Sequence, residues 1–94
     1  MAARKTDFTI EAQQNLIKTV HYLATDVTRH CTIGEISEAL ALTKNKVQWT
    51  LHNLRERGWV EQSGDGWRLG QAIARIAEAI RKAHADSLQR YLGA

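Results

Sequence analysis

Apolar residues near the start of the chain recur at the spacing of one helix face. They predict an amphipathic helix from about Ile10 to Thr25, with its stripe turned toward the core. Thr9 or Asp7 is placed to cap the start of this helix. The stripe consists of Ile10, Leu16, Ile17, Val20, Leu23, Ala24 and Val27.

A second, shorter helix is predicted from Thr32 to about Leu40. Thr32 and Glu35 have the spacing of a capping box, in which each side chain bonds the other residue's backbone amide. Residues 30–32, just before it, form a short bridge with a strand-like pair. Cys31 in this bridge is expected to be a small buried apolar residue.

A third helix is predicted from Lys44 to Arg57. Thr43 has a side chain suited to the N-cap, and Gly58 can end the helix in the left-handed conformation. The second and third helices are joined by the short segment 41–43. This arrangement is typical of a helix-turn-helix.

Beyond Gly58 the hydrophobic period changes from helical to alternating. The runs 59–62 and 67–69 flank the turn residues 63–66, which predicts a β-hairpin. One register puts a charged pair on one face and an apolar pair on the other. Its pairs are Gln62 with Trp67, Glu61 with Arg68, and Val60 with Leu69.

The chain is predicted to end in a long helix, from Gln71 to about Leu92. Its apolar residues suit either of two partners: the chain's own first helix, or a second copy of the chain. We favour a homodimer, which would set the two copies of the third helix in two-fold-related positions. The expected dimerisation residues are Ile73, Ile76, Ile80, Leu88 and Tyr91.

The predicted fold class is mainly α with a small β-hairpin. The order of elements is that of a winged helix-turn-helix, a three-helix core with a wing, followed by a long C-terminal helix. We divide the chain into a flexible tail at 1–8, the winged helix-turn-helix domain at 9–70 and the C-terminal helix at 71–94.

Several residues between Thr32 and Gly70 follow the pattern of a known family. They are Thr32-Ile33-Gly34-Glu35-Ile36, Leu42, Lys44, Val47, Leu51, Leu54, Gly58-Trp59-Val60-Glu61 and Leu69-Gly70. In them the segment 32–70 resembles the N-terminal DNA-binding domain of IclR-type transcriptional regulators. The resemblance implies a winged helix-turn-helix that binds double-stranded DNA.

The sequence departs from this family at positions that touch DNA in it. The family usually has proline where Thr43 stands, a small hydroxyl residue at Asn45 and Lys46, and arginine at Trp49. The family's target sequences therefore do not carry over. Residues 71–94 stand where the family continues into an effector-sensing domain, so we expect no small-molecule effector.

The third helix separates core residues from polar ones. On a helical wheel Val47, Leu51 and Leu54 share one face, and Asn45, Trp49 and His52 lie opposite. Four basic residues against one acidic residue give the segment 43–57 an excess of positive charge. The chain as a whole carries only +3. We therefore expect the outer face of this helix to enter a major groove.

Two cations, Lys44 and Lys46, stand in the first turn, where the helix dipole disfavours positive charge. They suggest contact with an external anion, DNA phosphate, although screened surface lysines would look the same. Trp49 suits contact with DNA or protein, or a fold back onto the first helix. Arg68 suits a phosphate contact or a pair with Glu61. The predicted DNA-binding residues are Thr43, Lys44, Asn45, Lys46, Gln48, Trp49, His52, Asn53, Arg57 and Arg68.

Other functions have little support in the sequence. It shows no catalytic arrangement, no zinc-finger spacing and no long apolar run, so we expect no enzyme, metal, cofactor or membrane span. A single cysteine suits the cytoplasm, or a nucleoid-associated protein. One alternative stays open. The charges of residues 30–69 balance, so a winged-helix module for protein–protein assembly is the second hypothesis.

Overall fold

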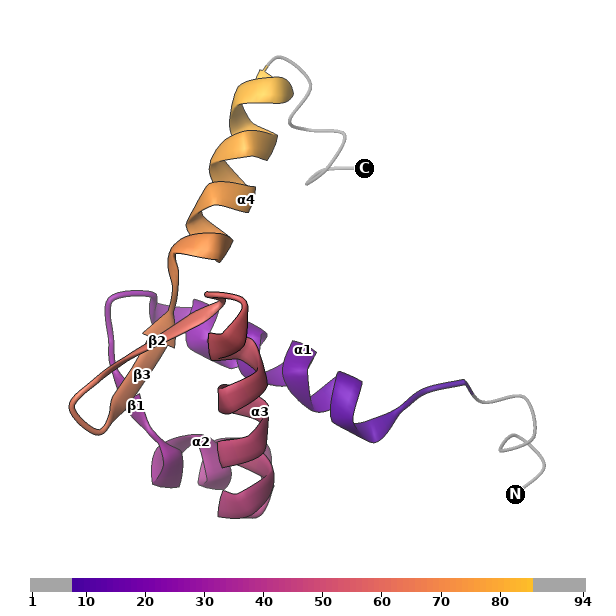
Figure 1. Cartoon of the computed structure of the whole chain (residues 1–94), viewed down its shortest axis with the longest axis vertical. Helices are drawn as coiled ribbons and strands as arrows, with labels where there is room; N and C mark the ends of the chain where they lie inside the picture. The colour runs from indigo at the N-terminus through magenta and orange to yellow at the C-terminus, as the bar shows by residue number, and fades with distance from the viewer. Residues whose placement is uncertain (1–7, 86–94) are drawn as a thin grey trace.

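The computed structural model describes residues 8–85 (Figure 1). A helical body carries a small sheet on one side, and the last helix projects from it. The elements are α1 (Glu11–Leu23), η2 (Ala24–Asp26), β1 (Cys31–Thr32), α2 (Ile33–Leu40), α3 (Lys44–Glu56), β2 (Val60–Ser63), β3 (Gly66–Leu69) and α4 (Gln71–Ala83). This is the predicted winged helix-turn-helix.

The start of α1 differs from the prediction. Its N-cap is Ile10, which makes no side-chain cap hydrogen bond, so Thr9 does not occupy the predicted N-cap position. Asp7, the other candidate, lies outside the described residues. Glu11 in the first turn provides the negative charge that a helix N-terminus favours. The helix ends at Leu23, because the chain tightens into the 3-10 turn η2.

The buried face of α1 was also predicted only in part. Leu23 is buried, but Ile10, Ile17 and Val27 are all more than half exposed. The buried positions between them are polar, namely Asn15 and Thr19. The Thr19 hydroxyl donates to the Asn15 carbonyl over 2.8 Å, so the helix backbone satisfies this hydroxyl without water.

The capping box at the start of α2 is confirmed. The Glu35 amide donates to Thr32 Oγ1 over 3.1 Å, and the Thr32 amide donates to Glu35 Oε1 over 2.9 Å. Arg29 also contacts the Glu35 carboxylate at 2.6 Å. These bonds fix the first turn of α2 and the angle at which the chain leaves β1.

Both ends of α3 agree with the prediction. Thr43 is the N-cap, and its hydroxyl accepts from the Lys46 amide over 3.2 Å. Gly58 follows the helix with φ +74°, a conformation that glycine adopts without strain. Between α2 and α3, Ala41 also has a positive φ, of 56°.

The sheet has the order β1-β3-β2, and both neighbouring pairs are antiparallel. All three predicted pairs of the hairpin are confirmed: Val60 with Leu69, Glu61 with Arg68, and Gln62 with Trp67. The bridge before α2 is β1, whose Cys31 pairs with Trp67. The hairpin of β2 and β3, which forms the wing, is therefore tied to the body along β1.

The core lies where α3 meets α1, α2 and the sheet. Val47, Leu51 and Leu54 face inward as predicted, and Cys31 is buried as a free thiol. Leu42 and Trp59 pack against this core from its edges. The buried apolar residues are Leu23, Cys31, Ile36, Val47, Leu51, Leu54, Val60 and Trp67.

The last helix, α4, is shorter than predicted and leaves the body. It ends at Ala83 rather than near Leu92, with basic residues in its last turn, where the helix dipole favours them. It has no buried residue and projects away from the body, so it does not pack along α1 (Figure 1). Two of its predicted dimerisation residues, Leu88 and Tyr91, lie outside the described residues.

A backbone junction sets the direction of α4. The Gly70 amide donates to the Trp59 carbonyl over 2.8 Å, and the Ala72 amide donates to the Gly58 carbonyl over 3.1 Å. A Cβ at Gly70 would lie 2.4 Å from the Gly58 carbonyl oxygen. Only glycine fits this close approach. Within residues 8–85, no helix has the length and apolar character needed to cross a membrane.

Candidate nucleic-acid interface

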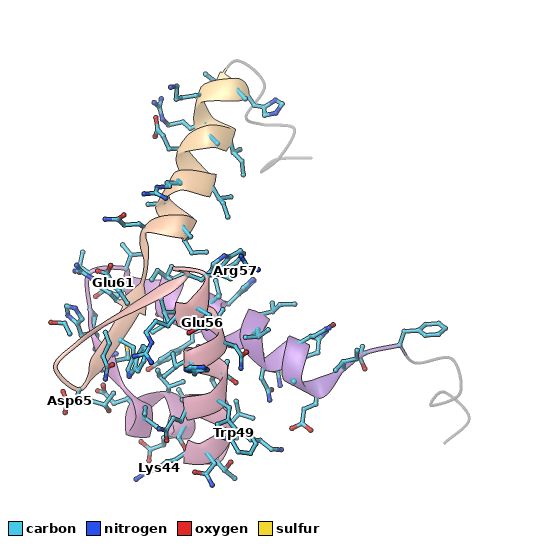
Figure 2. All side chains as sticks on the ribbon, in the orientation of Figure 1. Lys44, Trp49, Glu56, Arg57, Glu61 and Asp65 are labelled. Atoms are coloured by element: carbon cyan, nitrogen blue, oxygen red, sulfur yellow. The ribbon has the colours of Figure 1, made fainter. Side chains whose placement is uncertain are left out.

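The outer face of α3 is free of the rest of the body. Trp49 is 68% exposed, and Lys44, Asn45, Gln48 and His52 are also exposed. Within residues 8–85 the structure gives no side-chain hydrogen bond or ion pair to these four polar residues. Figure 2 shows Lys44 and Trp49 at the end of α3 that lies far from α4. The prediction that this face points to solvent is confirmed.

At the start of α3, the predicted contact residues Thr43 and Lys46 have structural partners. Thr43 caps α3 through its hydroxyl. Lys46 Nζ lies 2.6 Å from the Glu11 carboxylate, in the first turn of α1. The cation at this position is therefore partly neutralised by the protein itself.

The wing stands beside the first half of α3. A hollow of about 390 Å³ separates them, and it is lined by the α2 N-terminus, α3, the wing turn and Trp67. Its polar lining residues include Lys44, Gln48, Gln62 and Asp65. These residues come from α3, from β2 and from the hairpin turn, so the hollow is a concave surface with α3 on one side and the hairpin on the other.

Arg55 holds the wing against α3. Its guanidinium donates to Gln62 Oε1 over 3.1 Å and lies 5.4 Å from the centre of the Trp67 ring. Arg68 on the wing pairs with Glu61 at 2.7 Å, the cross-strand alternative in the sequence analysis. The pair leaves Arg68 partly exposed, so its guanidinium still reaches solvent.

Two predicted residues lie away from the main group. Arg57 is at the opposite end of α3 from Lys44 (Figure 2). It lines an apolar groove of about 580 Å³ between α1 and the end of α3. Asn53 faces α1, and its amide donates to the Trp49 carbonyl over 2.8 Å.

Sequence reasoning did not find two residues next to this face. Glu11 and Asn15 of α1 line a second hollow with Lys46, Trp49 and Asn53. The hydrogen bond and charge of Lys46 hold the pKa of Glu11 below its usual value, and a hydrogen bond from Asn15 adds to this. The only signal in the sequence was an acid in the first turn of a predicted helix, which says nothing about a contact with α3.

The described part of the chain contains no cluster of three or more residues able to hold a metal ion. The arrangement offers cations at the helix start, amide and imidazole groups along the outer face, and an exposed indole. These groups bind anions, hydrogen-bond base edges and pack on apolar surfaces.

Comparison with known protein families agrees with this fold. Residues 19–64 match the IclR helix-turn-helix domain. The winged helix-turn-helix of this chain is therefore similar to the IclR helix-turn-helix domain over residues 19–64. This agrees with the resemblance found in the sequence, and it supports DNA binding and transcription regulation as the general function of the domain.

Among solved structures, the fold of the chain is similar to the crystal structure of a protein assigned as an IclR transcriptional regulator from a Silicibacter species. The TM-score is 0.60 and the sequence identity is 22%, over 72% of this chain. The match covers 28% of that protein, so the chain spans less than a third of its length. No curated protein sequence matches the chain.

Proposed function

We propose that this chain binds double-stranded DNA with sequence selectivity, through the outer face of α3, as a transcriptional regulator. One observation carries the proposal. Lys44, Asn45, Gln48 and His52 are exposed on one helix face and have no side-chain partner within residues 8–85. The same helix seals Val47 and Leu51 into the core. A rigid helix with a free polar face is what a major groove accepts.

The proposed roles follow from the chemistry of each group. Asn45, Gln48 and His52 donate to and accept from base edges, and so discriminate between sequences. Lys44 and Lys46 contact phosphate, which fixes the position of the helix without reading sequence. Trp49 packs against sugar or a thymine methyl.

The wing supports the same arrangement. It stands across a hollow from Lys44 and Gln48, and Arg55 braces it through Gln62 and Trp67. With α3 in a major groove, the wing would lie over the adjacent backbone. In that position Arg68 would contact phosphate while it stays paired with Glu61.

We further propose that the chain acts as a homodimer. The apolar face of α4 contains Ile73, Ile76 and Ile80, and none of the three is buried. The backbone hydrogen bonds to Gly58 and Trp59 set the direction in which α4 leaves the body. Trp59, whose carbonyl accepts from the Gly70 amide just before α4, also lines the apolar groove between α1 and the end of α3. A second copy would cover both, because it presents the same surfaces in return.

The experiment is selection of bound sequences from a random duplex pool, followed by titration of the selected duplex and a scrambled one. We expect a preferred site, and binding that weakens steeply as salt rises. Asn45→Ala and His52→Ala should narrow the difference between the two duplexes. Absence of duplex binding at low salt would overturn the proposal.

The competing function is a winged-helix module that binds another protein. The exposed Trp49 favours this function. So do the ion pairs of Lys46 with Glu11 and of Arg68 with Glu61, because they reduce the positive charge left for DNA. The salt titration separates the two functions. A contact made mainly through apolar groups would depend weakly on salt, whereas one with phosphate depends steeply.

A further inference from the structure

The ion pair between Glu11 and Lys46 links α1 to the proposed DNA-reading helix. Lys46 Nζ and Glu11 Oε2 are 2.6 Å apart, and the two residues are 35 positions apart in sequence. The first turn of α3 contains no acidic residue of its own. The negative charge next to Lys46 therefore comes from α1.

Glu11 is held in this position from its own helix. Asn15, one turn further along α1, is 4% exposed, lines the same hollow as Glu11 and helps to lower the pKa of its carboxyl. A buried side chain has few alternative conformations, so Asn15 presents a fixed polar group beside Glu11. The result is a short chain of contacts from the α1–α3 interface to the first turn of α3.

We propose that Glu11 competes with DNA phosphate for the Lys46 ammonium, and so weakens binding to every duplex. The inference rests on the proposed function, in which the outer face of α3 meets DNA. It assigns Glu11 as an attenuator of affinity built into α1.

Competition follows from charge and exposure. The side chains of Lys46 and Glu11 are 46% and 66% exposed, so the pair can open without disturbing the core. A phosphate that approaches Lys46 comes close to the Glu11 carboxylate, and the two negative charges repel. The ammonium has further donors to offer, but the carboxylate beside it cancels part of its charge.

The effect should be modest and independent of sequence. Exposed ion pairs are weak, so removal of the carboxylate changes affinity by about twofold to fivefold. Phosphate contacts carry no base information, so every duplex should gain by the same factor. Discrimination by Asn45 and His52 should therefore not change.

The test is Glu11→Gln in the full chain, titrated with the selected duplex and with a scrambled one. Glutamine keeps the shape and removes the charge. We expect affinity for both duplexes to rise by about twofold to fivefold, with a salt dependence that steepens by up to about 0.9 in slope. Glu78→Gln is the matched control. It makes the same change in net charge and breaks the 2.7 Å pair with Arg81 on α4, away from Lys46.

A double variant decides whether the gain passes through Lys46. In a Lys46→Ala background, Glu11→Gln should no longer raise affinity. The inference is overturned if Glu11→Gln gains no more than Glu78→Gln, if it lowers affinity, or if its gain persists without Lys46. The unmodified chain reports separately on the proposed function. If it binds duplex while Glu11→Gln shows no gain, only the competition is lost, whereas no binding by any variant removes both proposals.

Discussion

Val47 and Trp49 stand two positions apart on α3, yet Val47 is 0% exposed and Trp49 is 68% exposed. The contrast separates folding from binding at this helix. We predict that Trp49→Ala leaves the free energy of unfolding within about 0.5 kcal/mol of the unmodified chain, because the indole contributes little to the core. Affinity for duplex DNA should fall by about tenfold, or roughly 1.4 kcal/mol. Chemical unfolding and duplex titration measure the two effects.

Trp67 provides the control for this prediction. It is the same residue type but only 5% exposed, because its side chain belongs to the core. Trp67→Ala should cost about 3–5 kcal/mol of stability, which a domain this small can scarcely tolerate. If Trp49→Ala destabilised the chain to a similar extent, Trp49 would be a packing residue and its proposed contact with DNA would lose its basis.

Lys44 tests the phosphate contact without the complication of an ion pair. Lys44→Ala should weaken binding to all duplexes alike and reduce the slope of log affinity against log salt by about 0.9. Lys82→Ala removes the same charge from the exposed face of α4 and should leave the slope nearly unchanged. Equal effects from the two variants would mean that only net charge matters.

The elements set by local patterns were predictable from the sequence. Thr32 with Glu35 gave the start of α2, Gly58 gave the end of α3, and the register of the hairpin followed from alternating residues. Each depends on residues a few positions apart. The outer face of α3 was predictable for the same reason, because helical periodicity alone separates Val47 from Trp49.

Features that depend on distant parts of the chain were not predictable. The buried face of α1 is set by how α1 lies against α3, and this places Thr19 inside and Ile17 outside. The pair of Glu11 with Lys46 joins two helices that no local pattern connects. The hollow between α3 and the wing likewise exists only once β1 has tied the hairpin to the body.

Ala41 offers a prediction about stability alone. It connects α2 to α3 with φ 56°. This left-handed conformation costs a residue that has a Cβ about 1–2 kcal/mol. Ala41→Gly removes this strain and adds the ordering cost of glycine, about 0.4–1 kcal/mol. We expect a net gain in the free energy of unfolding of about 0.5–1 kcal/mol. Ala39→Gly, at an exposed position within α2, should instead lose about 1 kcal/mol.

The apolar face of α4 tests the proposed homodimer. Ile76 is 44% exposed and lies between Ile73 and Ile80 on this face. Ile76→Asp puts a charge where a second copy would pack, so the chain should sediment as a monomer at concentrations where the unmodified chain is a dimer. Ala74→Asp puts the same charge on the opposite face of α4 and should leave the dimer intact. Loss of the dimer should also weaken binding to a two-fold site much more than binding to a half-site, because each copy then binds alone. A monomeric unmodified chain, or dimers unaffected by Ile76→Asp, would show that a second copy does not cover this face.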